Sequence, residues 1–281
     1  MRESTFIAWN GLQMHIPGDW NLHVGGPRHL VFEKDFQPQI QIRWEKENSR
    51  ISSQTKSKLT AAISKIGRVL PELPPAWLLL SEKFSHVTGY RQANGFPGGL
   101  YFLCPKCKTI FLVQLLTENQ TVIDCITTCL LTLTCQQSHQ TLWRIQDFSL
   151  RTPVSFSLRD YTFGAGLTRL SFCRGELFLH TCRIAPADDR LRQQSLENIL
   201  QSLSGADELA VTTTDNIACH GYRSPSIGRQ LLFRMRREKP FLWTKIWHDE
   251  DNNRLLAVIL SSNHPIPEET ADNICAHYEI V

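Results

Sequence analysis

Two cysteines in the segment Cys104-Pro105-Lys106-Cys107 have the clearest chemical spacing in this 281-residue chain. A Cys-x-x-Cys turn between two strands can direct two thiolates at one tetrahedral zinc ion. A closed zinc site needs two further ligands, and the chain contains no second Cys-x-x-Cys. Candidates for those ligands are Cys125, Cys129, Cys135, His139, Cys173 and Cys182. The segment is therefore interpreted either as a zinc knuckle or as an ordinary hairpin turn.

We expect this turn to form without a metal, and we expect the protein to need no cofactor. A matching turn in the second half of the chain, His248 to Asn253, contains Asp, Glu and Asn residues instead of cysteines. Substitution of Cys104 or Cys107 by Ser is then expected to be nearly silent. Zinc bound by these two cysteines is the alternative, and in that case substitution would release the metal and loosen the hairpin.

A second group of candidates combines aromatic and basic side chains. Trp243, Lys245 and Trp247 alternate along a predicted strand and therefore share one face. Trp is frequent in the energetic centres of protein interfaces, so we predict that this face binds a partner; burial in the core is the alternative. Arg234 and Arg236 would share one face if their segment is also a strand. They could meet an acidic protein or nucleic-acid phosphates, whereas a solvated sheet face is the simpler interpretation.

Composition and motif content argue against the common enzyme classes and against an obligate nucleic-acid binder. The chain has 30 Lys and Arg against 27 Asp and Glu, so its net charge is only +3. The signatures of serine hydrolases, zinc peptidases, dinucleotide-binding enzymes and P-loop nucleotide hydrolases are absent. We therefore predict a protein that is not an enzyme. An enzyme with an unrecognised site between its domains is an alternative.

The sequence predicts a cytoplasmic protein that does not enter a membrane. Its first residues lack the apolar stretch of a secretory signal. Its longest apolar runs, such as Ala76 to Leu80, are far shorter than the roughly 20 residues that cross a bilayer. Nine cysteines, an odd number, favour reduced thiols over a disulfide framework.

The chain contains signs of an internal duplication. Gly89-Tyr90-Arg91 recurs as Gly221-Tyr222-Arg223. Two apolar helix faces, both spaced i, i+3, i+4, i+7, also match each other: Leu59, Ala62, Ile63 and Ile66 with Leu196, Ile199, Leu200 and Leu203. We therefore predict two domains, residues 1–138 and 139–281, the second a diverged duplicate of the first.

The elements predicted between these helices are mostly strands. Gln39 to Trp44 alternates polar and apolar residues, as a strand with one wet face does. Hairpins are predicted at Leu100 to Leu116 and at Leu242 to Leu260. Because short turns join most successive strands, the sheets should be mainly antiparallel. The predicted fold class is α+β: two tandem domains, each a mainly antiparallel sheet with packed helices.

Each half resembles the Mog1/PsbP-like fold in its order of elements. The short motif of that resemblance is Ile16-Pro17-Gly18-Asp19-Trp20, a strand that runs into a Pro-x-x-Trp turn. The second half has Phe156 in place of the Trp. Known members of that family bind other proteins, so the resemblance implies an adaptor or accessory protein with a protein partner. A nucleic-acid-associated accessory factor, with a basic strand and a zinc knuckle, is the alternative.

Overall fold

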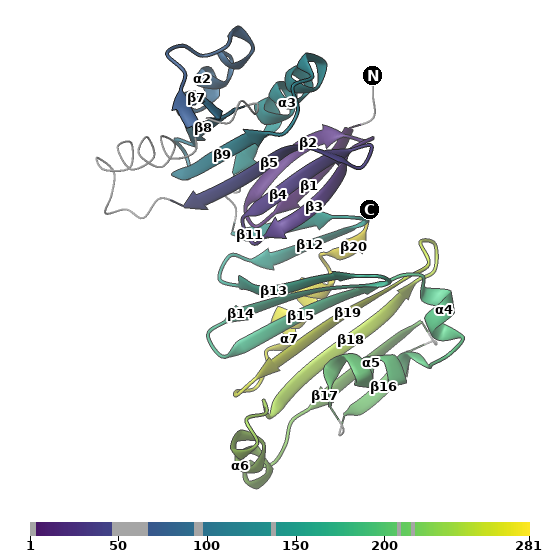
Figure 1. Cartoon of the computed structure of the whole chain (residues 1–281). Coiled ribbons are helices and arrows are strands. Elements are labelled where there is room, and N and C mark those ends of the chain that lie inside the picture. The colour runs from purple at the N-terminus through teal and green to yellow at the C-terminus, as the bar shows by residue number, and fades with distance from the viewer. Residues whose placement is uncertain (1–3, 47–66, 93–97, 136–138, 207–208, 215–216) are drawn as a thin grey trace. The chain divides into compact units, whose positions relative to one another are not determined.

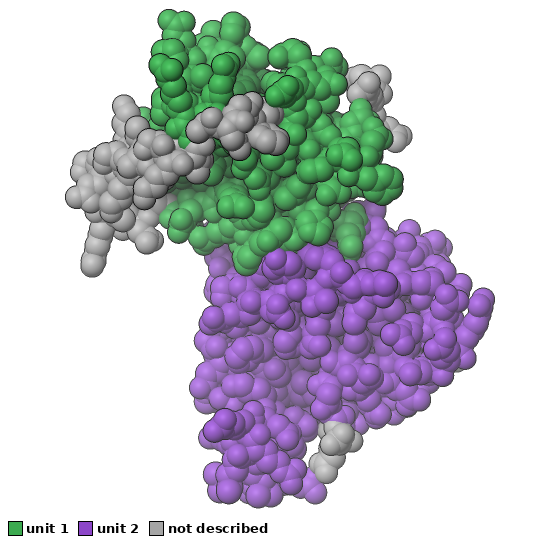
Figure 2. Space-filling view, viewed as in Figure 1, with its two compact units in different colours: residues 1–138, 142–146 green, residues 139–141, 147–281 purple. Residues whose placement is uncertain are grey.

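The computed structural model describes residues 4–46, 67–92, 98–135, 139–206, 209–214 and 217–281. The chain divides into two compact units (Figure 2): residues 1–138 with 142–146 form unit 1, and residues 139–141 with 147–281 form unit 2. Each unit is built around an antiparallel sheet of seven strands (Figure 1).

Unit 1 has its seven-stranded sheet in the order β3-β4-β5-β9-β8-β7-β6. These strands are β3 (Asn21–Gly26), β4 (His29–Lys34), β5 (Gln37–Lys46), β6 (Gly67–Val69), β7 (Ser85–Gln92), β8 (Gly99–Leu103) and β9 (Thr109–Leu115). Four further strands lie side by side in the order β10-β2-β1-β11. They are β1 (Ser4–Trp9), β2 (Leu12–Pro17), β10 (Thr134–Cys135) and β11 (Gln140–Ile145). The helical segments are η1 (Pro75–Trp77), α2 (Leu80–Lys83) and α3 (Gln120–Thr132).

Unit 2 has its seven-stranded sheet in the order β13-β14-β15-β19-β18-β17-β16. These strands are β13 (Ser157–Gly164), β14 (Leu167–Arg174), β15 (Leu177–Ile184), β16 (Ala210–Thr214), β17 (Ala218–Arg223), β18 (Phe241–Asp249) and β19 (Arg254–Ser262). Strands β12 (Phe148–Pro153) and β20 (Tyr278–Ile280) pair antiparallel with each other. The helices are α4 (Ala187–Leu191), α5 (Leu196–Ser204), α6 (Ile227–Met235) and α7 (Glu268–Cys275).

The two seven-stranded sheets have the same strand order. Three successive strands occupy one side of each sheet, and four strands in reversed order occupy the other. The repeated Gly-Tyr-Arg lies on β7 in unit 1 and on β17 in unit 2, which hold the same position in their sheets. Of the two predicted helix faces, Leu196 to Leu203 lies on α5, whereas Leu59 to Ile66 lies outside the described residues.

Helix α5 shows how the sequence determines a helix in unit 2. The Ser195 hydroxyl caps its first turn by accepting a hydrogen bond from the Asn198 N–H, and Gly205 ends it in the left-handed conformation at φ 63°. Leu196, Ile199 and Leu200 are buried against a core that includes side chains of β15, β17, β18 and β19. Burial of one face at helical spacing is what the apolar periodicity predicts.

The predicted α+β class was wrong. Strands form 52% and helices 21% of the structure, in three sheets, so the protein is a mostly antiparallel β protein with few helices. The helices are short: α2, α4, α5, α6 and α7 have between four and nine residues. A few apolar residues at helical spacing are enough to predict a helix, but they do not show how little of the chain it occupies. Within the described ranges, no helix is both long and apolar enough to cross a membrane.

Candidate functional site

Helix α6 of unit 2 turns its large apolar side chains to solvent. Ile227, Leu231 and Met235 follow one another at intervals of four residues, so they lie on one helix face. They are 86%, 62% and 74% exposed, and the neighbouring Leu232 is 56% exposed. None of the nine residues of α6 is buried. A helix packed on a core would have the opposite pattern.

Contacts between α6 side chains and neighbouring segments of unit 2 hold the helix in this orientation. The Arg223 guanidinium lies over the Phe233 ring at 4.3 Å. The Gln230 side-chain amide donates a hydrogen bond to the Pro225 carbonyl over 2.9 Å. Arg234 donates one to the Asn263 carbonyl over 3.2 Å. The helix is therefore held through Phe233 and polar groups, which leaves its apolar face outward.

Basic residues are frequent in α6 and in the segment that follows it. The segment from Ile227 to Lys239 contains five basic residues, Arg229, Arg234, Arg236, Arg237 and Lys239, and one acidic residue, Glu238. Arg236 and Arg237 directly follow the helix and are exposed. We call Ile227, Leu231, Leu232, Met235, Arg236 and Arg237 the α6 surface.

The predicted basic strand at Arg234 and Arg236 was wrong. Arg234 is in the last turn of α6, and Arg236 is the residue that caps its end. Two positions apart on a helix correspond to about 200° of rotation, so these side chains do not share a face. The alternation from Phe233 to Arg236 resembles a strand, whereas the spacing of Ile227, Leu231 and Met235 fits a helix. The second pattern is the one that the structure follows.

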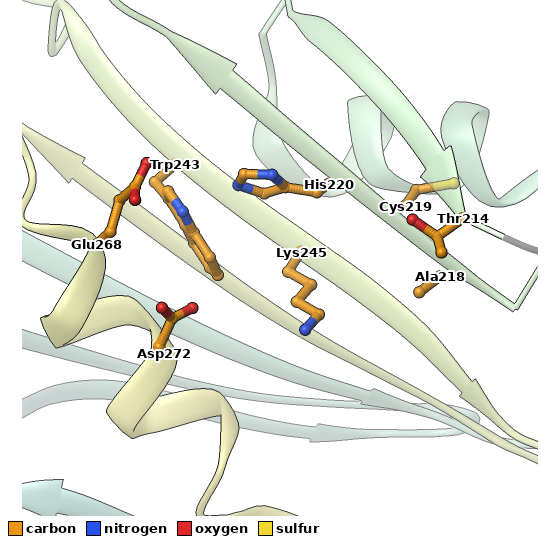
Figure 3. Close-up of a pocket in the computed structure, with 8 residues that line it drawn as sticks. All are labelled: Thr214, Ala218, Cys219, His220, Trp243, Lys245, Glu268 and Asp272. Atoms are coloured by element: carbon orange, nitrogen blue, oxygen red, sulfur yellow. The ribbon is translucent and has the colours of Figure 1, made fainter.

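The other predicted partner-binding residues lie on β18, beside a pocket of about 330 Å³ (Figure 3). Trp243 is 7% exposed, whereas Lys245 and Trp247 are half-buried. Trp243 and Lys245 line the pocket, and Trp247 packs edge-on against Tyr278 with 5.8 Å between ring centroids. The full lining is Thr214, Ala218, Cys219, His220, Trp243, Lys245, Glu268 and Asp272.

The pocket combines an imidazole, an ammonium group and two carboxylates. His220 faces Lys245 across the β17–β18 pair, while Glu268 and Asp272 lie one turn apart on α7. Burial and the charge of Lys245 lower the pKa of His220, whereas Glu268 and Asp272 act in the opposite direction. The buried His220 Nε2 has no hydrogen-bond partner among the described residues. Such a pocket can hold a small polar molecule.

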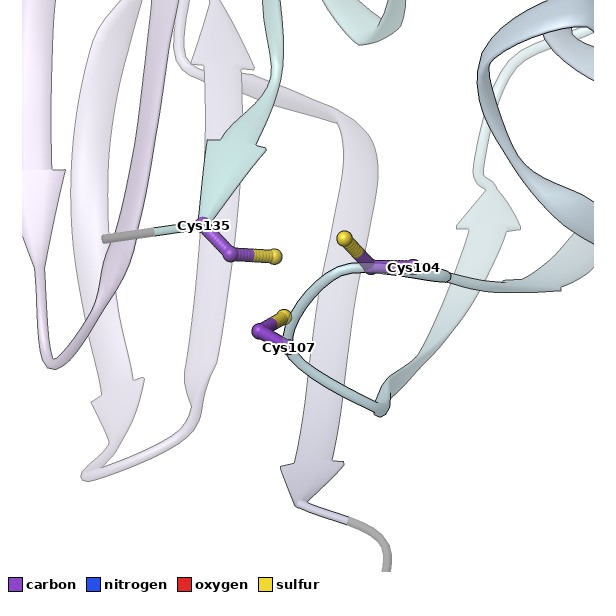
Figure 4. A group of neighbouring side chains, drawn as sticks. All are labelled: Cys104, Cys107 and Cys135. Carbon is purple, nitrogen blue, oxygen red and sulfur yellow. The ribbon is translucent and has the colours of Figure 1, made fainter. Parts of the chain in front are cut away.

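Three thiols meet in unit 1, in what we call the thiol cluster: Cys104, Cys107 and Cys135 (Figure 4). Their sulfur atoms all lie within 4.8 Å of one another. Cys104 is buried and the other two are half-buried. Of the six further ligands that the sequence offered, the structure brings only Cys135 to the predicted pair, within the part of the chain that it describes.

Two separate segments position the thiol cluster. Cys104 and Cys107 belong to the turn between β8 and β9, where the Cys104 N–H donates to the Thr109 carbonyl over 2.9 Å. Lys108 has a left-handed conformation, with φ 56°, that returns the chain into β9. Cys135 ends the short strand β10, which pairs with β2 directly after α3.

The three thiols share hydrogen bonds. Hydrogen bonding from Cys135, then from Thr109 and Cys104, lowers the pKa of Cys107 to about 5. Hydrogen bonding to Cys107 and burial raise the pKa of Cys135 well above the ordinary thiol value. The thiolate form of Cys107 is therefore stabilised by the thiols beside it.

Comparisons with models of protein families, with curated proteins and with solved structures gave no match, so the resemblance of each half to the Mog1/PsbP-like fold stays a prediction.

Proposed function

We propose that this protein is a non-enzymatic adaptor whose α6 surface binds an acidic, amphipathic segment of another protein. The observation that carries the proposal is the outward apolar face of α6, with Ile227 86% exposed and Met235 74% exposed. Contiguous exposed apolar residues with a polar rim are typical of protein interaction sites. Amphipathic segments recognise such a face through apolar residues spaced along a helix.

Covering this face gives a partner its binding energy. Burial of one Leu, Ile or Met side chain contributes about 1.5–3 kcal/mol. Several such side chains side by side can offset the loss of rigid-body freedom on association, which costs at least about 4 kcal/mol. Binding of a partner therefore explains why the apolar face of α6 points away from the core of its own unit.

The charge around the face selects among partners. Two copies of the chain joined through α6 would bring Arg236 and Arg237 of each close to those of the other, and like charges across an interface are unfavourable. Nucleic-acid phosphates could pair with the arginines but would leave Ile227 and Leu231 uncovered. An acidic segment with apolar residues satisfies both halves of the α6 surface, because its carboxylates can pair with Arg side chains.

The nine cysteines fit a cytoplasmic location for this adaptor. All nine are free thiols in the structure, and thiols stay reduced in the cytosol.

Site-specific photo-crosslinking in the native cell tests the proposal. A photoreactive amino acid replaces Leu232 in one strain and Val154 in a control strain. Val154 is equally exposed, at 57%, and belongs to the same unit. We expect position 232, but not position 154, to crosslink to a protein, and the crosslinked peptide to be acidic with apolar residues at helical spacing.

The other outcomes contradict the proposal. Crosslinks from position 232 to nucleic acid, to anionic lipid or to a second copy of the chain would assign the α6 surface to that ligand instead. A crosslinking pattern that is the same at positions 232 and 154 would mean that the apolar face of α6 binds nothing specifically.

A further inference from the structure

The thiol cluster has the shape of a metal site. Three ligands at the zinc–sulfur distance of about 2.3 Å lie about 3.8 Å apart in a tetrahedron. The three sulfur atoms already lie within 4.8 Å of one another, so they need to approach by at most about 1 Å. Rotation of the side chains of the two half-buried cysteines, Cys107 and Cys135, can supply that movement. Figure 4 shows the three side chains pointing toward one another from the two segments.

Neither burial as core residues nor a disulfide accounts for this arrangement. A cysteine that acts as a small apolar side chain has no need of other thiols around it. Here Cys107 is half-buried in a surface turn and still directs its sulfur toward the other two. A disulfide would join two of the sulfurs and leave the third unused. One ion that binds all three accounts for the convergence of separate segments.

Lys83 supplies the charge that a zinc–thiolate centre needs. Its ammonium donates a hydrogen bond to the Leu131 carbonyl over 2.5 Å, at the end of α3. Cys104 and Cys135 of the thiol cluster are among its electrostatic neighbours. Three thiolates around Zn²⁺ have a net charge of −1, and an ammonium group beside them neutralises it.

We propose that Cys104, Cys107 and Cys135 bind one Zn²⁺ as three thiolate ligands and leave the fourth position to water. Binding displaces the protons that remain on the thiols, and these go to solvent. The structure describes all nine cysteines and all ten histidines of the chain, and no other thiol or imidazole joins this group. Three protein ligands with one open position distinguish the centre from the closed four-ligand sites of zinc knuckles.

Metal analysis and cobalt substitution of the intact protein test this proposal. The protein is purified without chelators and its zinc content is measured. The metal is then removed and Co²⁺ is added, because thiolate-to-cobalt charge transfer reports the number of bound thiolates. We expect about one zinc per chain and a charge-transfer band with the intensity of three thiolates. Alkylation in the loaded state should spare Cys104, Cys107 and Cys135, as identified by peptide mass spectrometry.

Single substitutions then assign the ligands. Cys104→Ser, Cys107→Ser and Cys135→Ser should each lose stoichiometric zinc and weaken the cobalt band. Cys275→Ser, at a half-buried cysteine of unit 2, should keep both. The zinc content and the cobalt band of the wild-type protein test the proposal by themselves. The test therefore still holds if one of the substitutions prevents folding. Wild-type protein with little zinc and no cobalt band would overturn the proposal, as would unchanged metal binding in Cys135→Ser.

Discussion

At the scale of single residues, the three cysteines show what spacing in the sequence can and cannot predict. Cys104 and Cys107 are two residues apart in a turn, so their proximity follows from local geometry. Cys135 reaches them through the pairing of β10 with β2, where it lies opposite Leu12. No local pattern encodes a pairing between residues so distant in the sequence. The sequence therefore offers Cys135 only as one of six candidates for a further zinc ligand and does not distinguish it from the other five.

Lys83 provides a residue-scale prediction for the thiol cluster. Replacement of Lys83 by Met removes the ammonium beside Cys104 and Cys135, so zinc affinity should fall by about 10–100-fold, as is usual for groups that support metal ligands. Competition with a chromophoric zinc chelator measures it. Lys34→Met is the matched control, because Lys34 pairs with Asp19 in the same unit and should not affect the metal. Equal zinc affinities of the Lys83→Met and Lys34→Met variants would show that Lys83 does not support the metal site.

Asp147 provides a second residue-scale prediction, on stability in unit 2. Although burial raises its pKa, hydrogen bonds from Arg183 and from Arg254, the latter over 2.7 Å, hold the pKa below the ordinary value. A lowered pKa in the folded state contributes stability that is fully present above the unfolded value of about 3.9 and is lost as pH falls through the folded value. Asp147→Asn should therefore cost about 1–2 kcal/mol at pH 7, with partial screening because the carboxylate is partly exposed.

Urea unfolding at several pH values measures that difference. The wild-type advantage should shrink as the pH falls below about 4. Asp189→Asn, in an exposed pair with Arg192, is the control and should change stability by no more than about 0.5 kcal/mol. A cost of Asp147→Asn that stays constant down to acid pH would mean that the charge of the carboxylate does not contribute.

At the scale of elements, α5 and α6 explain why one helix was predicted and the other was not. On α5, Leu196, Ile199 and Leu200 face the core, and Gly205 marks its end. On α6 the apolar residues face solvent, and the alternation of apolar and basic residues from Phe233 to Arg236 led to the interpretation as a strand. The sequence pattern identifies an apolar face, but whether that face meets the core or a partner depends on packing.

The buried face of α5 carries an element-scale prediction. Leu200 is fully buried in the core beneath the sheet of unit 2, so Leu200→Ala should lower the free energy of unfolding by about 2–5 kcal/mol. Chemical denaturation followed by circular dichroism measures this. Ser202→Ala, at an exposed position of the same helix, should stay within about 0.5 kcal/mol of wild type. Similar effects of the two substitutions would show that α5 does not pack as described.

At the scale of the whole chain, the repeated strand order is the most informative feature. Both seven-stranded sheets follow the same order, and the sequence indicated the repeat through one tripeptide and through apolar spacings. It could not indicate the fold class, because the number of residues in strands depends on long-range pairing that local periodicity does not report. The matching hairpins, β8–β9 and β18–β19, differ at their tips, and only the first carries the two cysteines.

The thiols give a prediction for the whole molecule. Thiol counting in denaturant, without reductant and after removal of metal, should find nine free groups. Cytosolic glutathione and thioredoxin keep such thiols reduced. Two or more stable disulfides would contradict the cytoplasmic location, and the position of each in the chain would be read from peptide mapping.

The central claim, that α6 binds a partner through its apolar face, is tested most directly by titration of the crosslinked partner after purification. Leu231→Asp and Met235→Asp place a carboxylate on that face, and Val154→Asp places one at another exposed apolar position of unit 2. Isothermal titration calorimetry should show at least about a tenfold weaker Kd for each α6 variant, as expected for central interface residues, and wild-type affinity for Val154→Asp. Wild-type affinity in both α6 variants would contradict the account.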